Sequence, residues 1–284
     1  MNRVTANATR TGQSPWRCYP NLRMDPRPIG VFDSGVGGLS VVRALQSLAP
    51  SESMVYFADT AWFPYGPRPA GEVRKRSFAI ARKLLDLDCK LIVVACNTAS
   101  AAALDDLRQV FLLPFVGMVP GVKPAVLQSS THHVAVLATP GTLGGDLYAE
   151  VRQRFGVAAR VEEVPGTGLA ELVELGQTGT PVARAAIRRA LGDAIARGAD
   201  TVVLGCTHYS FLAPEILAEF PGVEVVDTAE PVARRALSVL DELDLRAPAD
   251  GTGRLDLVVS GGRAEFRARM AALGFAPRPM EAVG

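Results

Sequence analysis

Two cysteines stand at the ends of apolar runs, where side chains suited to proton transfer could meet. Cys96 follows the run 91–95, and Cys206 follows the run 201–205. A thiol has an ordinary pKa near about 8.5, and a helix N-terminus or a nearby imidazolium favours its thiolate. One group rarely reaches both faces of a carbon, so inverting a stereocentre calls for two acid/base groups. The matched thiols predict that chemistry, although a single buried cysteine is as often an inert hydrophobe.

Polar residues that could assist these thiols also follow apolar runs. His208 could donate to a substrate carboxylate or assist Cys206. Asp33 and Ser34 lead into a glycine-rich segment, whose amides and following helix start could bind a small anion. That segment has neither P-loop nor GxGxxG spacing, which disfavours a nucleotide. Asp33 could bind an ammonium group, orient the Cys96 side, or only cap a helix.

Hydroxyl and amide side chains near these ends could hydrogen-bond carboxylates. They are Asn97, Thr98, Thr139, Thr142 and Thr207. Each by itself is equally ordinary as a turn or cap residue, and Tyr65 with Gly66 indicates only a turn. The other cysteines and histidines are given no chemical role: Cys18, Cys89, His132 and His133.

The elements that must position these residues alternate along the chain. Apolar runs predict strands over 28–32, 54–58, 91–95, 115–116, 134–138, 201–205, 223–226 and 255–258. Helical patterns lie between them, over 73–87, 100–111, 181–197 and 232–243. This alternation predicts parallel sheets with right-handed crossovers, and ligands bind beyond the carboxyl ends of such strands.

A weak internal repeat suggests two related halves. The segment around Cys96 resembles the segment around Cys206, and the segment at 29–35 resembles the one at 134–141. We therefore expect an α/β fold with two similar parallel-sheet subdomains, related by a pseudo-twofold and facing one cleft. The predicted limits are 27–121 with 228–284 for the first subdomain and 122–227 for the second. Residues 1–26 are expected to form a flexible arm, with Met24 a candidate start.

Composition excludes several classes of function. The 284 residues are 48% hydrophobic and 21% charged, with a net charge of +1, so there is no electrostatic case for nucleic acid or an anionic membrane. We expect no membrane span and no secretory signal. Four cysteines without a CxxC pair predict neither a disulfide scaffold nor structural zinc. Reduced thiols and a cytoplasmic setting are the expectation.

Six stretches taken together resemble the glutamate racemase family. They are GVFDSGVGGLS at 30–40, YFADT at 56–60, PYG at 64–66, ACNTA at 95–99, TPGT at 139–142 and LGCTHY at 204–209. They occur in the family's order and cover about residues 27–275. The resemblance implies interconversion of L- and D-glutamate for peptidoglycan synthesis, without pyridoxal phosphate, another cofactor or metal. It also implies a bacterial cytoplasmic setting and common homodimers.

The resemblance assigns roles by position. It implies Cys96 and Cys206 as the acid/base pair and a supporting Glu for the second thiol. That Glu is expected to be Glu174, 32 residues before Cys206, with Glu171 as its competitor. The implied substrate-binding residues are Asp33, Ser34, Tyr65, Gly66, Asn97, Thr98, Thr207 and His208.

The chain also departs from the family pattern. Trp62 stands where a basic residue is usual, and Gly145 stands where Ser is frequent. Both are expected to lie beside the site, where they could alter packing around it.

Other functions stay open at the level of sequence. A related racemase could use the same thiols on aspartate or another small acid. A non-catalytic protein could close two lobes on a small acid, and would then tolerate Cys96→Ser. A regulator of a larger partner is a third class, for which we find no charge run or amphipathic segment.

Overall fold

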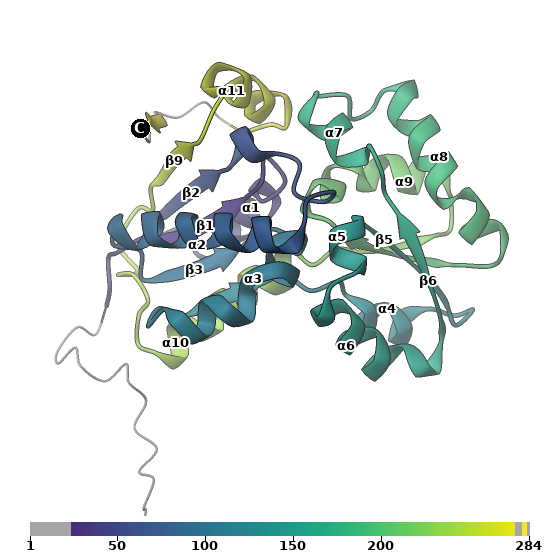
Figure 1. Ribbon diagram of the computed structural model, residues 1–284, viewed down its shortest axis with the longest axis horizontal. Helices are drawn as coiled ribbons and strands as arrows, with labels where there is room; N and C mark the ends of the chain where they lie inside the picture. The colour runs from purple at the N-terminus through teal and green to yellow at the C-terminus, as the bar shows by residue number, and fades with distance from the viewer. Residues whose placement is uncertain (1–23, 276–279, 283–284) are drawn as a thin grey trace, which may run out of the picture.

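Two parallel β-sheets run through the chain in this computed structural model, which describes residues 24–275 and 280–282 (Figure 1). The first sheet has the order β10-β9-β2-β1-β3-β4, and the second has the order β6-β5-β7-β8. The strands of the first are β1 (Ile29–Asp33), β2 (Met54–Ala58), β3 (Leu91–Val94), β4 (Phe115–Gly117), β9 (Leu255–Val259) and β10 (Met280–Ala282). Those of the second are β5 (His133–Ala138), β6 (Arg160–Pro165), β7 (Thr201–Gly205) and β8 (Glu224–Val226). The α/β class expected from the sequence is confirmed.

All eight predicted strands are present, with ends that differ by at most one residue. The central strands β1, β3 and β7 are buried along their whole length, which is why their sequences are continuous apolar runs. The sequence did not reveal β6, whose charged residues are partly exposed at the edge of the second sheet. It did not reveal β10 either.

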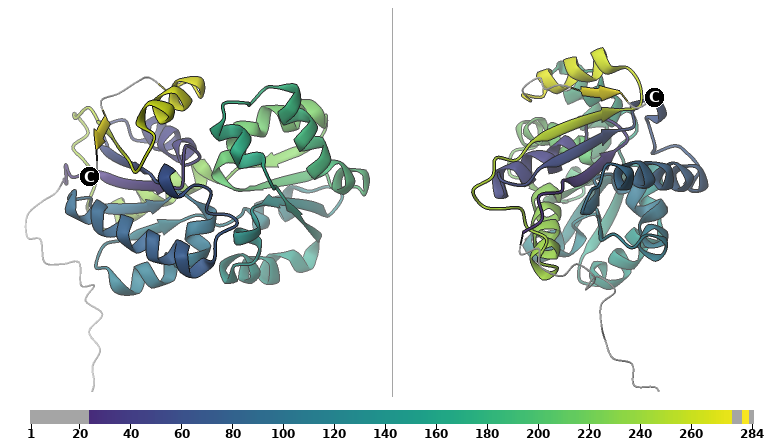
Figure 2. Two further views of the ribbon diagram at one scale, coloured as in Figure 1. Left: turned by 45° about the horizontal axis from the view of Figure 1, so that its top comes forward. Right: turned by 90° about the vertical axis from the view of Figure 1, so that its left-hand side faces the viewer.

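Helices cover both faces of the first sheet (Figure 2). Alternating residues of β1 show the division: Phe32 packs with α2 and α3, while Val31 packs with α1 and α10. The α-helices are α1 (Leu39–Leu48), α2 (Ala70–Asp86), α3 (Asn97–Val110), α4 (Val122–Gln128), α5 (Pro140–Leu143), α6 (Asp146–Phe155), α7 (Leu169–Glu174), α8 (Pro181–Ala196), α9 (Ala213–Glu219), α10 (Ala229–Glu242) and α11 (Arg263–Ala272). The part of the chain that the structure describes also has 3₁₀ helices: η1 (Thr60–Trp62), η2 (Gly156–Ala158) and η3 (Thr207–Leu212).

The four predicted helices are also present, as α2, α3, α8 and α10. Three of them begin three residues earlier than the apolar pattern does, because the first turn of a helix needs no apolar face. Within the described residues, none of the helices has the length and apolar character required to cross a bilayer.

The chain enters the second sheet after β4 and returns to the first through α10, which packs against α1. One hydrophobic core runs through both halves, from β1 and α1 to β7 and α8. The predicted subdomain limits and the pseudo-twofold relation stay predictions.

The predicted N-terminal arm falls almost wholly outside the described residues, as does Cys18. Within its last three residues, Asp25 is buried, and its backbone N–H donates to the carbonyl of Arg246 at 2.8 Å. The Asp25 carboxylate also pairs with Arg27 at 2.6 Å. The chain is therefore already attached to the first half at Asp25.

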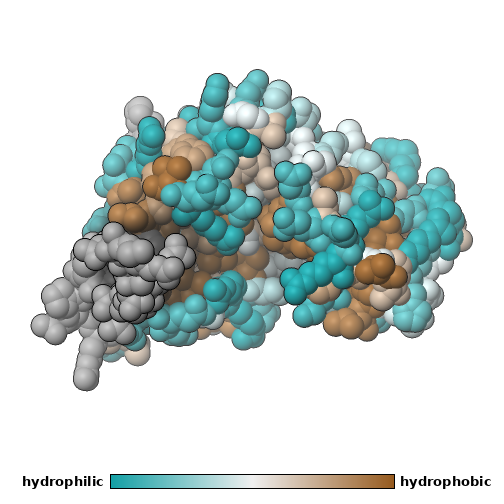
Figure 3. Space-filling view, turned by 60° about the horizontal axis from the view of Figure 1, so that its bottom comes forward, coloured by the Kyte–Doolittle hydropathy of each residue, from teal (hydrophilic) through white to brown (hydrophobic). Residues whose placement is uncertain are grey.

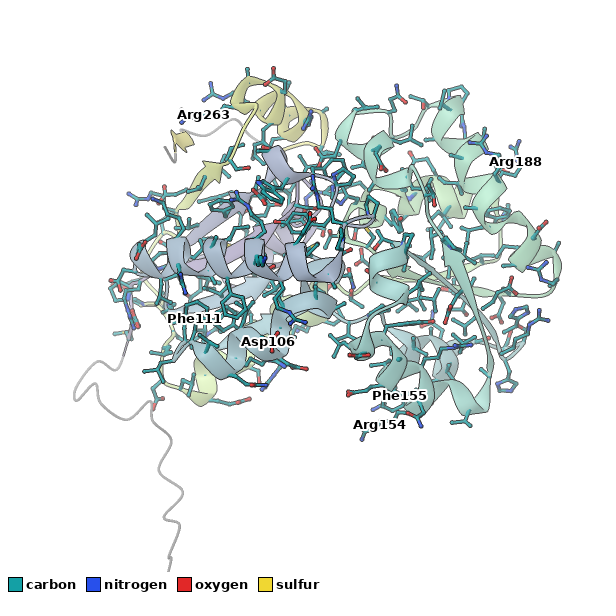
Figure 4. All side chains as sticks on the ribbon, viewed as in Figure 1. Asp106, Phe111, Arg154, Phe155, Arg188 and Arg263 are labelled. Atoms are coloured by element: carbon teal, nitrogen blue, oxygen red, sulfur yellow. The ribbon has the colours of Figure 1, made fainter. Side chains whose placement is uncertain are left out.

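An apolar hollow lies on the lower face of the second half, over α4, α6 and η2 (Figure 3). Leu127 and Val157 are exposed there. Arg154 and Phe155 extend outward from the same face, with the guanidinium 5.1 Å from the ring centroid (Figure 4). This hollow shares no residue with the cavity that holds the two strand-end cysteines.

Candidate active site

A cavity of about 170 Å³ lies where strands of both sheets end. Ser34 follows β1 and Cys96 follows β3, while Thr139, Gly166 and Cys206 follow β5, β6 and β7. Carboxyl ends of parallel strands expose backbone groups and helix starts, so this edge is where an open α/β fold binds ligands. The structure thus brings the two predicted thiols into one cavity.

Each thiol stands at the N-cap of the helix that follows its strand. Cys96 precedes α3 and Cys206 precedes η3, and both are nearly buried. Burial raises the pKa of Cys96, and the Asp33 carboxylate raises it further. Hydrogen bonds from the backbone of Ala99 and Ser34 oppose this rise without cancelling it. Cys96 is therefore a neutral thiol near pH 7 with these neighbours.

A hydrogen-bonded chain leads away from the other thiol. His208 Nδ1 lies 3.8 Å from Cys206 Sγ, and His208 Nε2 lies 2.8 Å from Glu174 Oε1. Burial lowers the pKa of His208, but the contacts with Cys206 and Glu174 and the charge of Asp33 raise it more. For Glu174, burial raises the pKa, and the His208 hydrogen bond leads the contacts that bring it below its usual value. An imidazolium beside a carboxylate follows.

Asp33 ends β1 and lies behind the cavity lining. Its Oδ1 accepts the Gly35 N–H at 2.7 Å, and its Oδ2 accepts the Thr207 hydroxyl at 2.9 Å. Burial raises the pKa of Asp33, and the charge of His208 with these hydrogen bonds partly offsets that rise. Since Thr207 belongs to η3, the contact joins β1 of the first sheet to the segment that carries Cys206.

Asn97 presents a buried amide to the cavity. Neither its Oδ1 nor its Nδ2 has a hydrogen-bond partner within the part of the chain that the structure describes. A buried polar group without a partner costs about 1–3 kcal/mol, so such an arrangement points to a polar ligand that supplies the missing bonds.

Three threonines form a hydroxyl cluster beside Asn97. The Thr98 hydroxyl lies 2.9 Å from that of Thr139, which lies 3.0 Å from that of Thr142. Thr98 and Thr139 line the cavity, while Thr142 is buried behind them and packs in α5. The cluster joins α3 to the segment after β5.

Tyr65 and Gly66 form part of the cavity wall. The Tyr65 hydroxyl donates to Asp59 Oδ2 at 2.5 Å, and Arg76 pairs with the same carboxylate. The Gly66 carbonyl accepts the Gly141 N–H at 3.1 Å, which fixes this loop to the second half.

The two departures from the family pattern lie outside the cavity lining. Trp62 lies beneath two guanidinium groups, with Arg68 at 5.0 Å and Arg76 at 5.4 Å from its ring centroid. At Gly145 a Cβ would approach Ala101 Cβ to 2.7 Å, so there is little room for a larger residue. Through Arg76 and Asp59, Trp62 is linked to Tyr65.

The predicted site residues thus divide into two groups. Ten line the cavity: Ser34, Tyr65, Gly66, Cys96, Asn97, Thr98, Thr139, Cys206, Thr207 and His208. Three stand behind it and bond to the lining: Asp33, Thr142 and Glu174.

Several lining residues were missed or ranked lower from sequence. Glu171 lines the cavity, whereas its neighbour Glu174 contacts His208. Thr167 follows β6, and the strand-end rule would have found it had β6 been recognised. Phe63 packs against the His208 ring at 5.5 Å between centroids, and nothing in the PYG turn signals that contact.

The chain is also similar to known proteins in sequence and in fold. The Asp/Glu/Hydantoin racemase family matches residues 29–236. A glutamate racemase of Herpetosiphon aurantiacus is 43% identical over 247 residues, covering 86% of this chain and 96% of that protein. The crystal structure of glutamate racemase from Thermus thermophilus with β-chloro-D-alanine aligns with a TM-score of 0.79 and 39% identity, covering 91% and 98% of the two chains. The Escherichia coli glutamate racemase in complex with L-glutamate and an activator aligns with a TM-score of 0.79 and 34% identity, over 91% and 98%.

Proposed function

We infer the function from family membership, because this chain belongs to the Asp/Glu/hydantoin racemase family. It is a glutamate racemase, an isomerase that interconverts L- and D-glutamate. The observation that carries this conclusion is the pair of strand-end thiols, Cys96 and Cys206, in one cavity. D-glutamate made in this way supplies peptidoglycan synthesis. A cytoplasmic setting, a homodimer and independence from cofactors complete the proposal.

The proposed reaction is a proton exchange at Cα. One thiolate removes the Cα proton and becomes a thiol, leaving a carbanion conjugated with the substrate carboxylate. The thiol on the other face then protonates Cα and becomes the thiolate. The substrate leaves as its mirror image, with no net gain or loss of protons, and the two cysteines have exchanged protonation states. Both cysteines act in each direction: the one that is the base for one enantiomer is the acid for the other.

Neutral hydrogen-bond donors are proposed to hold the two substrate carboxylates. The described residues that line the cavity include no Lys or Arg. Ser34, Asn97, Thr98, Thr139 and Thr207 present hydroxyl and amide groups there instead. Backbone N–H groups of the segments after the strands add to them. We assign Asn97 the main role in binding these carboxylates, because its Oδ1 and Nδ2 are buried without partners among the described residues.

Charged residues behind the cavity are proposed to set the protonation of the thiols. The Asp33 carboxylate disfavours a second negative charge on Cys96, so thiolate formation there requires a compensating positive charge. The substrate ammonium group supplies that charge on binding. On the other side, His208, held by Glu174, is proposed to assist proton transfer at Cys206.

The test is an optical one. Purified protein with L-glutamate, and separately with D-glutamate, is followed by circular dichroism without added cofactor. Both signals should decay to zero, and aspartate should react at least about tenfold more slowly, since one methylene is worth about 10- to 200-fold. Decay with aspartate alone would keep the mechanism and change the substrate. The absence of decay with any acidic amino acid would favour a binding protein.

A further inference from the structure

An arginine of the last described helix reaches the group that holds His208. Arg269 of α11 places Nη1 2.9 Å from Glu174 Oε2. The Glu174 side chain is 5% exposed and that of Arg269 is 29% exposed. Glu174 belongs to α7, beside the second sheet, whereas α11 follows β9 of the first sheet, and the two helices lie next to each other (Figure 1). The contact therefore joins the two halves.

The packing of α11 fixes the position of this arginine. Phe266 and Met270, on either side of Arg269 in the helix, are fully buried in the core. The Phe266 ring stacks on Tyr56 at 6.3 Å, and the Tyr56 hydroxyl donates to the Gly35 carbonyl at 2.7 Å. The same helix thus supports the glycine segment and delivers a cation to Glu174.

The two carboxylate oxygens of Glu174 have different partners. Oε1 accepts the Val36 N–H at 2.7 Å and contacts His208 Nε2 at 2.8 Å, while Oε2 contacts Arg269. Partners on both oxygens define the rotation of the carboxylate about its last bond. If Arg269 were removed, the buried Oε2 would lose its charged partner, and the carboxylate that orients His208 would be less constrained.

We propose that Arg269 is a positioning residue for the Cys206 half of the reaction, acting through Glu174 and His208. This rests on the proposed racemase function and deepens it. Because the contact joins the two halves, the geometry of the site also depends on how α11 packs against the first half. Arg269 is not among the residues that line the cavity, so it acts without contacting the substrate.

The charges that face Glu174 set the expected pH effect. His208 and Arg269 are the cations in contact with it, and Asp33 and Tyr56 are the nearby acidic groups. Arg269 helps to hold the pKa of Glu174 below its usual value. Loss of this cation raises that pKa, so the carboxylate becomes protonated at a higher pH. The acidic limb of kcat/KM should therefore move toward neutral pH.

The experiment compares Arg269→Gln, Arg269→Lys and wild type from pH 5 to 9. Arg263→Gln is the matched control, because Arg263 is exposed on the same helix and points outward (Figure 4). For Arg269→Gln we expect kcat/KM to fall roughly 10- to 100-fold, as for a lost charge-assisted hydrogen bond. The midpoint of the acidic limb of its pH profile should move to a higher pH by about one unit. Arg269→Lys should restore the limb, and Arg263→Gln should match wild type. An unshifted limb in Arg269→Gln would overturn the proposal.

A second measurement separates positioning from general damage to the fold. Wild type and Arg269→Gln react with L- and D-glutamate deuterated at Cα. If Arg269 acts on the Cys206 side, the kinetic isotope effect should grow for the enantiomer that Cys206 deprotonates, but not for the other. An equal change for both enantiomers would overturn the proposal while leaving the racemase function intact. Failure of the wild type to racemise glutamate would instead reject the function itself.

Discussion

The buried thiol of Cys96 lies beside a carboxylate that opposes its ionisation. Burial and Asp33 both raise its pKa, and the helix start at α3 does not compensate. The expectation that a helix N-terminus would favour the thiolate therefore describes only one of the forces at this position. A neutral resting thiol suits a site whose substrate brings its own ammonium group.

Alkylation kinetics test this state of Cys96. Iodoacetamide reacts with thiolates, so its rate at Cys96 should still be rising at pH 9 in substrate-free protein. Peptide mass spectrometry distinguishes Cys96 from Cys89. Burial raises the pKa of Cys89 to about 12. A rate at Cys96 that levels off below pH 8 would show that the thiolate already exists without substrate.

The buried amide of Asn97 makes a different prediction, in which activity and stability separate. Asn97→Ala removes two polar atoms that have no partner in the described structure, and alanine is the better helix former in α3. We expect the free energy of unfolding to stay constant or to rise by up to about 1 kcal/mol. Because the ligand loses its hydrogen bonds, kcat/KM should fall at least about tenfold.

Urea denaturation and initial-rate kinetics measure the two effects. Loss of stability together with activity would mean that Asn97 supports the fold rather than the ligand.

At the scale of elements, the segment between β1 and α1 approaches the second half so closely that a side chain does not fit at Gly35 or Gly37. A Cβ at Gly37 would lie 2.5 Å from His208 Nδ1 and from Thr207 Oγ1. At Gly35 it would lie 2.8 Å from the carboxyl carbon of Glu174. The absence of a side chain at these two glycines lets the segment contact the residues that support Cys206.

Gly37→Ala should therefore displace His208. We expect kcat/KM to fall roughly 100-fold, the effect of misplacing a catalytic group by about 1 Å. Gly71→Ala in α2 is the matched control, because a Cβ there has no described residue within 4 Å outside its own helix. It should keep full activity and gain about 0.5–1 kcal/mol of stability. Initial-rate kinetics and urea denaturation compare the two variants. Equal activities of Gly37→Ala and Gly71→Ala would contradict the close contact between Gly37 and His208.

At the scale of the whole molecule, contacts between distant segments assemble the cavity. Thr207 bonds to Asp33, and Glu174 bonds to Val36 and Arg269. Each of these bonds joins one sheet's side of the molecule to the other. The catalytic geometry therefore depends on how the two halves are held together.

This dependence explains what could be predicted from sequence. Cys96 and Cys206 follow continuous apolar runs, which mark buried parallel strands, so their place at the carboxyl edge could be inferred. The charged edge strand β6 lacks that signature, and Thr167 after it was missed. Arg269 lies 95 residues from Glu174 in a helix that buries Phe266 and Met270, and no local pattern reports such a contact.

The most direct test of the two-thiol mechanism follows both enantiomers in three variants: Cys96→Ser, Cys206→Ser and, as a control, Cys89→Ala. Circular dichroism with L-glutamate and with D-glutamate should decay to zero for wild type and for Cys89→Ala. Each serine variant should lose interconversion from both enantiomers, because every turnover needs one thiolate and one thiol. Near wild-type racemisation by either serine variant would contradict the two-thiol mechanism.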